Sequence, residues 1–345
     1  MAELNGKELS KSQLFKNAVN INQIASIDEV ELKDGRANGM KVFRVRSANG
    51  LAFDLLPSKC LDISALSYKG VNISLLTRNG VCSPENISPS DGEFERYFGG
   101  GMLWTGGLKN CGPNYRDDNS QFHHYHGRIG TLPAEQSWKR SYFDGDDYIL
   151  AAGATMRDTT IEGYNLELVR EVKTSLSKPE ILISDSIENL DYNDTDYLLL
   201  YHFNFGFPFI DEGLKMVFPD PEKPVIPGNK ESEKSIPDWN KLGPPIENAN
   251  ENLFFHSLKA DDDNTATVKL ENSNLGIGVY IRYETTYLPF LVEWKCMRAG
   301  EYALGIEPAN NLIQGMKQER RSGRSKKIAA GEKHEIKVAL GFYSL

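Results

Sequence analysis

The sequence lacks the hallmarks of a secreted, disulfide-stabilised or membrane-spanning protein. Its 345 residues include only four cysteines, at positions 60, 82, 111 and 296, and no CxxC pair. The first twenty residues contain no apolar signal-peptide core, and no apolar run approaches the roughly 20 residues that span a bilayer. We therefore expect reduced thiols, no membrane association and a cytoplasmic location.

Basic side chains are also fewer than acidic ones. The chain has 39 Lys and Arg against 48 Asp and Glu, a net charge of -9. Binding to a phosphate backbone needs a positive field, so this balance argues against a nucleic-acid partner. The composition, 40% hydrophobic and 25% charged, is that of an ordinary globular chain with a sizeable core. We expect a small-molecule partner, and the oligomeric state stays open.

Helical periodicity is sparse and is confined to residues 8–25, which predict one amphipathic helix. Short β-rich runs follow, two of them hairpins around Asn49-Gly50 and Lys69-Gly70. Further strands are expected at 148–156, 164–175, 180–190, 196–207, 265–271, 276–284, 288–296, 301–307 and 333–343. The pattern predicts an all-β protein, a large antiparallel β-sandwich over residues 31–345, preceded by a short N-terminal helical extension at 1–30.

Two stretches interrupt this pattern. Residues 219–251 hold seven prolines and many charges, which is too long for a routine connection. They form either a disordered excursion or a loop laid over the sheet, and Trp239 and Ile246 favour the loop. Residues 316–327 carry six basic side chains, which indicate either a solvated hairpin or a gate over an anionic ligand group.

One strand of the expected sandwich, LLYHFNFGFPF at 198–208, carries a titratable side chain among apolar ones. Period-2 alternation puts Tyr201 and the phenylalanines from Phe203 to Phe209 on one face, and His202 and Asn204 on the other. The aromatic face is typical of core. The face with an imidazole beside an amide is typical of a surface that contacts a polar ligand.

A second cluster of polar residues lies in the glycine-rich segment 98–135. No helix is expected after its glycines, which excludes a nucleotide-binding loop. His123, His124 and His126 follow, and in a strand His124 and His126 would share a face, so zinc is one alternative. The other is a sugar site without metal, in which the guanidinium of Arg128 would donate paired hydrogen bonds to hydroxyl or carboxylate groups. A third reading makes His126 a buried side chain bonded to the backbone.

The third candidate is Glu307 in the segment 304–315. Alternation places its carboxylate on the face of the small residues Ala303 and Gly305, where a ligand has room, and Pro308 is expected to end the strand. The alternative is a structural carboxylate paired with an arginine.

Five motifs occur in a fixed order along the chain. They are KCLDI at 59–63, FGGGMLWTGGLKNCGP at 98–113, HGRIGTLPAE at 126–135, HFNFGFP at 202–208 and GIEPANN at 305–311. In this order they resemble the aldose 1-epimerase (galactose mutarotase-like) superfamily, and most closely a bacterial branch of uncharacterised proteins. The resemblance covers about residues 40 to 343.

The resemblance implies a supersandwich of two large twisted antiparallel sheets that binds a sugar on a concave face, without a cofactor or a metal. By its motifs, His202 would be the general acid at the ring oxygen and Glu307 the general base at the anomeric hydroxyl. His126 would bind the sugar. The remaining candidate substrate-binding residues are Asp62, Trp104, His124, Arg128, Asn204 and Asn311.

The chain departs from the family pattern in two places. The family's substrate-binding aspartate has no evident counterpart, and Trp104-Thr105 stands where this branch is expected to carry a small Thr-Cys pair. Tyr201, Trp104 or Trp294 is expected to provide an aromatic platform for the sugar.

The resemblance favours an aldose 1-epimerase (mutarotase) that interconverts sugar anomers by general acid–base catalysis. A lyase or another isomerase of a modified sugar, possible with the same acid–base pair, is the first alternative. A non-catalytic carbohydrate-binding protein is the second. The catalytic hypotheses require His202 and Glu307 to face one another across a sugar-sized gap.

Overall fold

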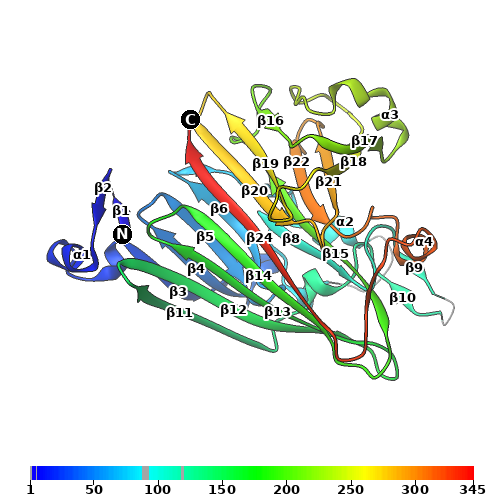
Figure 1. The fold of residues 1–345 in the computed structure, drawn as a ribbon, viewed down its shortest axis with the longest axis horizontal. Helices are drawn as coiled ribbons and strands as arrows, with labels where there is room; N and C mark the ends of the chain where they lie inside the picture. The colour runs from blue at the N-terminus through cyan, green and yellow to red at the C-terminus, as the bar shows by residue number, and fades with distance from the viewer. Residues whose placement is uncertain (1, 5, 88–92, 118–119) are drawn as a thin grey trace.

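The computed structural model is built almost entirely from antiparallel strands (Figure 1). It describes residues 2–4, 6–87, 93–117 and 120–345. Three large sheets and two small strand pairs make up the described chain. The α-helices are short: α1 Lys11–Asn17, α2 Phe94–Tyr97, α3 Lys230–Lys234 and α4 Met316–Arg321. Single turns of 3-10 helix lie at Ile21–Gln23, Gly35–Ala37, Pro84–Asn86, Ile129–Thr131 and Ile236–Asp238.

The largest sheet has eight strands in the order β11-β12-β13-β14-β24-β20-β19-β16. Their bounds are β11 Gln136–Asp144, β12 Asp147–Thr159, β13 Asn165–Ser175, β14 Glu180–Asn189, β24 Lys333–Ser344, β20 Ile277–Glu284, β19 Thr265–Asn272 and β16 Lys215–Val217. Burial alternates residue by residue along β13, β14 and β19, so one face of this sheet packs on the core and the other faces solvent.

The second sheet has seven strands and carries the strands that matter for function. Its path is β17-β18-β21-β22-β15-β23, and β8 also pairs with β15. The bounds are β17 Pro221–Pro227, β18 Asn252–Leu258, β21 Phe290–Cys296, β22 Ala303–Ala309, β15 Thr195–Phe205, β23 Lys326–Ile328 and β8 Leu103–Leu108.

The third sheet has five strands in the order β3-β4-β5-β6-β7. They are β3 Ala25–Glu31, β4 Lys41–Ser47, β5 Leu51–Leu56, β6 Asp62–Tyr68 and β7 Val71–Asn72, and the two-stranded pairs are β1 Ala2–Leu4 with β2 Lys7–Leu9 and β9 Tyr115–Arg116 with β10 Phe122–His123. The hairpins expected around Asn49-Gly50 and Lys69-Gly70 are confirmed as β4-β5 and β6-β7. Buried side chains from all three large sheets join in one core cluster.

The strands at the centre of the second sheet are buried on both faces, unlike the strands of the first sheet. Strands β8 and β22 are buried along their whole length, and β15 from Tyr197 onward, because both faces of this part of the sheet are covered. Tyr201, Phe203 and Phe205 face the main core as expected. Phe207 does not, because β15 ends at Phe205 and leaves the ring 73% exposed.

The single helix expected over residues 8–25 is wrong in length. Helix α1 covers Lys11–Asn17 and is capped by Ser10, whose hydroxyl accepts a hydrogen bond from the backbone N–H of Gln13. Ala18 is extended and ends the helix, and Asn20 caps a separate 3-10 turn before β3 begins at Ala25. Competing caps within the segment therefore divide the amphipathic pattern.

Strand β22 runs through Pro308, which was expected to end it. Pro308 lies opposite Leu291 of β21, while the register with β15 skips from Ile306 to Ala309. The missing N–H of Pro308 therefore falls where pairing with β15 is interrupted, which is the position a sheet tolerates.

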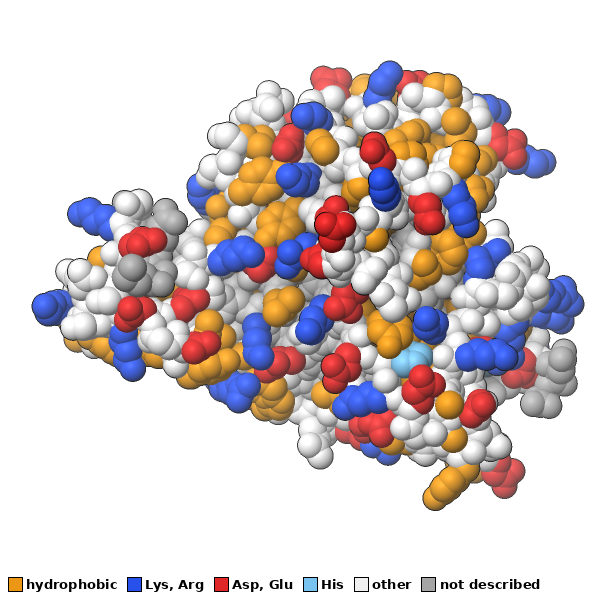
Figure 2. All heavy atoms as spheres, viewed as in Figure 1, with side chains coloured by type: hydrophobic (Ala, Val, Ile, Leu, Met, Phe, Trp, Pro, Cys, Tyr) orange, Lys and Arg blue, Asp and Glu red, His pale blue; other side chains and the backbone are white. Residues whose placement is uncertain are grey.

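The two irregular stretches both belong to the folded body. Residues 219–251 contain β17, α3 and a 3-10 turn, and Trp239 packs on Phe218 and on His256 of β18, so this stretch is laid over the sheet. The basic segment forms α4 and β23 rather than a hairpin, and Arg320 and Arg324 form ion pairs with Asp196 and Glu319. Figure 2 shows acidic and basic side chains interspersed over one face.

The N-terminal segment is joined to the sandwich through β3. This strand spans residue 30, the expected boundary of the N-terminal extension, and pairs with β4 along its whole length. In the described chain, no helix has both the length and the apolarity needed to cross a bilayer.

Candidate active site

A cleft of about 860 Å³ opens at the β15–β22 side of the second sheet. Its polar groups include His126, His202, Glu251 and Glu307, and its aromatic walls include Phe94, Tyr125 and Trp294. These residues come from β15, β21, β22, α2 and two connecting segments. The volume and the mixture of aromatic walls with a few convergent polar groups are typical of a small-molecule site.

His202 lies on β15, opposite Trp104 of β8. Its side chain borders the cleft but is only 9% exposed, and burial lowers the pKa of the imidazole to about 3. Nδ1 is buried and has no hydrogen-bond partner within the described residues. The ring is therefore neutral near pH 7 and holds an unused polar atom, which is unusual for a side chain with only a structural role.

Glu307 lies on β22, and its Oε1 is 3.2 Å from Nε2 of His202. The side chain is 1% exposed, and Oε1 makes no hydrogen bond to the described part of the chain. Burial raises the pKa of the carboxyl well above its usual range, and the nearby charge of Glu251 raises it further. Glu307 therefore pairs with a histidine, and the arginine partner of the structural alternative is not what the structure shows.

The two side chains touch, whereas a sugar-sized gap was expected between them. The cause is the strand register, which pairs Phe203 with Ile306 and thus sets His202 opposite Glu307. In these neutral forms one proton can move between the two groups, and it lies on the carboxyl of Glu307 or, after transfer, on the imidazole of His202. When the proton lies on the imidazole, His202 can act as a general acid and the Glu307 carboxylate as a general base.

Gly305 creates the space that the Glu307 carboxyl occupies. The two residues share a face of β22, and a Cβ built at position 305 would clash with Oε1 of Glu307 and crowd Trp294. A residue without a side chain is therefore needed at position 305 for the carboxyl of Glu307 to lie where it does.

His126 reaches the cleft from a loop that is docked on β8. Its φ is +54°, Gly127 has a φ of +79°, and a Cβ on Gly127 would clash with the backbone of Gly107. The backbone N–H of Gly112 donates to Nδ1 of His126 over 3.2 Å, and burial lowers the pKa of this imidazole well below its usual value. The ring proton of the neutral form is then on Nε2, which is available to donate to a ligand.

Aromatic rings form a box around the polar groups. The ring of Trp294 lies 5.7 Å from that of His202, and the rings of Phe94 and Tyr125 are 5.0 Å apart. Trp294 is the member of the expected platform that lines the cleft. Tyr201 is turned to the opposite face of β15, where its hydroxyl donates to Asp185.

Glu251 is a cleft residue that sequence reasoning missed. It precedes β18, and its carboxylate accepts a 2.8 Å hydrogen bond from Nε1 of Trp294. The local sequence NANEN is polar except for Ala249 and shows no period-2 pattern of apolar residues. Only the tertiary structure, which places this loop beside β21, identifies Glu251 as a cleft residue.

Three expected substrate-binding residues are buried and bonded within the protein. Asp62 accepts hydrogen bonds from Thr105 and pairs with Arg170 at 2.7 Å. The amide of Asn204 donates to Gly101 and to the backbone oxygen of His202. Asn311 donates to Leu199 and accepts from Ile313. These contacts position β6, β15 and β22, and none of the three side chains lines the cleft.

Trp104, His124 and Arg128 also lie outside the cleft lining. Trp104 is buried behind it, with its ring 5.8 Å from His126 and 6.5 Å from His202. His124 is half-buried and Arg128 is exposed. The structure thus brings together His126, His202 and Glu307 out of the nine predicted site residues.

The zinc alternative depended on a strand through His124 and His126. Strand β10 ends at His123, whose Nε2 lies 3.0 Å from Asp117. Within the described residues, no three His, Cys, Asp or Glu side chains cluster as metal ligands would. The four cysteines are free and buried.

Comparison with solved structures identifies the fold. A candidate aldose 1-epimerase from Klebsiella pneumoniae is 22% identical, with a TM-score of 0.87 over 92% of this chain and 83% of that one. A galactose mutarotase-like protein from Clostridium acetobutylicum is 18% identical, with a TM-score of 0.60 over 94% and 100%. Galactose 1-epimerase from Lactobacillus acidophilus is 13% identical, with a TM-score of 0.57 over 92% and 99%.

Sequence comparison identifies the family. Among curated proteins, none matches the chain significantly. The model of a domain of unknown function, DUF4432, matches residues 37–342, which is most of the chain. The expected galactose mutarotase-like fold is thereby confirmed, and the chain belongs to the DUF4432 family.

Proposed function

We propose that the protein is a cofactor-independent carbohydrate isomerase, an aldose 1-epimerase that interconverts the anomers of a free sugar. The observation that carries this proposal is the 3.2 Å contact between His202 and Glu307 at the edge of a sugar-sized cleft. The relatives of the same fold that are described as epimerases support the choice of reaction.

Mutarotation needs one proton removed from the anomeric hydroxyl and one delivered to the ring oxygen. Both oxygens are bonded to the same carbon, so an acid and a base that lie close together can reach them at once. In the proposal, the carboxyl proton of Glu307 first moves to Nε2 of His202, 3.2 Å away, as the sugar binds. The resulting carboxylate of Glu307 takes the anomeric proton and the imidazolium of His202 delivers its proton to the ring oxygen, which returns both groups to their starting forms. After the carbonyl has turned, the same groups act in reverse and close the ring.

The other cleft residues bind the sugar in this proposal. His126 donates from Nε2 to a hydroxyl, and Glu251 accepts from another. Trp294 provides an apolar face for the ring carbons, as aromatic side chains do in carbohydrate sites. Of these cleft residues, the proposal has only His202 and Glu307 exchange protons with the sugar.

NMR exchange spectroscopy on a panel of aldoses tests the proposal. The rate of exchange between α and β anomers should rise above the buffer rate for at least one sugar, and Glu307→Gln should abolish the increase. If no sugar exchanges faster than in buffer, mutarotation is the wrong reaction for this protein.

A non-catalytic carbohydrate-binding role is the second candidate. The unpartnered Nδ1 of His202 and Oε1 of Glu307 favour it, because both can bond sugar hydroxyls without any proton transfer. Sugar binding that persists in Glu307→Gln, with no turnover in the wild type, would support this role. Measured anomer exchange would exclude it. Turnover of a modified sugar with bond cleavage would instead indicate the lyase alternative, which uses the same acid–base pair.

A further inference from the structure

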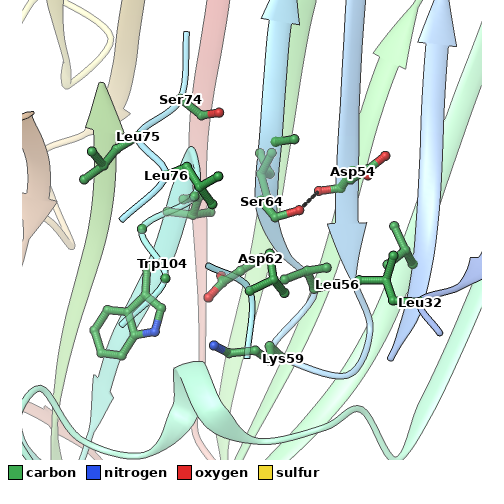
Figure 3. Close-up of a pocket in the computed structure, with 18 of the residues that line it drawn as sticks. Leu32, Asp54, Leu56, Lys59, Asp62, Ser64, Ser74, Leu75, Leu76 and Trp104 are labelled. Atoms are coloured by element: carbon green, nitrogen blue, oxygen red, sulfur yellow. Dashed lines mark hydrogen bonds between the residues drawn. The ribbon is translucent and has the colours of Figure 1, made fainter. Parts of the chain in front are cut away.

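A separate cavity of about 300 Å³ lies between β6 and the glycine-rich segment that precedes β8 (Figure 3). It adjoins the cleft across the segment Ser74–Leu76, which borders both. His126, His202, Glu251 and Glu307 are absent from its lining, so it is distinct from the proposed catalytic site. Much of its wall is apolar, with Leu32, Val42, Leu56, Leu75 and Val81 among the contributors.

The unusual member of this lining is Lys59, which is only 5% exposed. Figure 3 shows its amine directed toward Trp104 and Asp62. Within the residues that the structure describes, Nζ has no hydrogen-bond or ion-pair partner, although nearly all buried lysines are paired. The burial lowers the pKa of this amine, and the nearby charge of Asp62 partly opposes the effect.

The carboxylates that border the cavity are already bound to other cations. Asp62 is held by Arg170 at 2.7 Å and by two hydrogen bonds from Thr105. Asp54 is held by Arg44 at 3.0 Å. Each is therefore paired with an arginine, and neither forms an ion pair with Lys59.

A second polar group near the amine is also unused. The indole Nε1 of Trp104 is buried without a hydrogen-bond partner in the described chain, and Trp104 lines this cavity. Figure 3 places the indole nitrogen on the side of the ring that faces Lys59. Two donors without a protein partner therefore border one largely apolar cavity, which is the complement of an anion with an apolar body.

We propose that this cavity is a second binding site, which takes a small organic carboxylate whose carboxylate group pairs with Lys59 and whose apolar body packs against the leucine and valine walls. An uncharged ligand would leave the ammonium group unneutralised. A bare inorganic anion would leave the apolar walls without contacts. The site is independent of the proposed epimerase activity.

Isothermal titration calorimetry with butyrate and benzoate tests the proposal, with butyramide, benzamide and inorganic phosphate as comparison probes. The two carboxylates should bind, and the amides and phosphate should bind about 10-fold more weakly or worse, since an ionic hydrogen bond and apolar burial each contribute. Equal binding of carboxylate and amide, equal binding of phosphate, or no binding of either carboxylate would overturn the proposal.

Two variants locate the binding. Lys59→Met keeps the length of the side chain and removes the charge, and it should weaken butyrate binding about 10-fold or more. Ala65→Phe keeps Lys59 but adds a ring at the exposed position of β6 that borders the cavity, and it should also weaken binding. Lys16→Met, at an exposed position of α1, is the matched control and should bind as the wild type does.

The outcome does not depend on either variant alone. Lys59→Met removes an unpaired buried charge, so its thermal unfolding temperature should equal or exceed that of the wild type. Unchanged butyrate affinity in a folded Lys59→Met protein, or in folded Ala65→Phe, refutes the assignment to this cavity. Anomer exchange is not part of this test, so failure here leaves the proposed epimerase activity intact, and the reverse also holds.

Discussion

The imidazole of His202 and the carboxyl of Glu307 are cross-strand neighbours whose Nε2 and Oε1 lie 3.2 Å apart, although the two residues are 105 positions apart in the sequence. The contact follows from the register between β15 and β22, which holds both side chains at the same height and on the same face. The pair is nearly sealed from solvent except through the cleft. Each experiment below perturbs this pair or the structure that supports it.

Loss of either member of the pair should remove the proposed catalysis. A positioned acid or base contributes about 10²–10⁴-fold, so Glu307→Gln and His202→Gln should each lower the anomer-exchange rate by at least about 100-fold. Glu335→Gln, at an exposed position of β24, is the control and should retain full activity. A wild-type rate in either variant of the pair would remove that residue from the mechanism.

A methyl group at position 305 should displace the carboxyl without removing it. Gly305→Ala places a Cβ where Oε1 of Glu307 now lies, so the exchange rate should fall about as far as in Glu307→Gln. Gly243→Ala adds the same methyl group where no atom lies within contact distance, and it should be neutral. Circular dichroism would confirm that both proteins fold, and an active Gly305→Ala would show that the position of the Glu307 carboxyl is not critical.

The buried carboxyl should also make stability depend on pH. Burial raises the pKa of Glu307 above its unfolded value of about 4.3. The folded state therefore retains a proton that the unfolded state releases, and the wild type loses stability as the pH rises from about 4 through the folded pKa. Glu307→Gln lacks this titration, so its unfolding temperature should equal that of the wild type near pH 4 and exceed it increasingly toward pH 8.

Thermal unfolding across this pH range measures the difference directly. The lowered pKa of His202 acts in the opposite sense, since stability falls as the pH drops below about 6.5, but this histidine is present in both proteins. Its contribution largely cancels in the comparison. An unfolding-temperature difference that stays constant from pH 4 to pH 8 would mean that Glu307 titrates normally.

Arg170 should be the most sensitive structural residue behind the site. It is fully buried and is paired with Asp62 and with Asp185, each at 2.7 Å. Arg170→Met leaves two buried carboxylates without their cation, which should lower the free energy of unfolding by about 3–5 kcal/mol. Arg140→Met breaks an exposed pair with Glu171 and should cost under about 1 kcal/mol. Urea denaturation compares the two variants, and similar losses would contradict this role for Arg170.

Much of the fold could be predicted because its strands follow period-2 alternation. All nine strands expected from residue 148 onward are present, since each buries one face or lies in the sheet centre. Strands β8 and β17 are among those not predicted, because two adjacent glycines interrupt the pattern in one and three prolines interrupt it in the other. Their pairing depends on β15 and β18, which are distant in the chain.

The candidate site was predictable only where a residue type stood out from its strand. His202 and Glu307 did so, because each is a titratable group in a run of buried residues. Asp62 is titratable too, yet its partners are Arg170 and Thr105 rather than the cleft. Local sequence cannot separate these two cases, since the difference lies in what the rest of the chain places opposite the side chain.

By itself the sequence determined the class of fold and the strands that carry the acid–base pair, because alternation and burial act over neighbouring residues. The tertiary structure alone decided that His202 and Glu307 touch, that Glu251 joins them, and that Lys59 is left without a partner beside a second cavity. These relationships depend on strand register and loop packing between segments far apart in the chain, which no local pattern encodes.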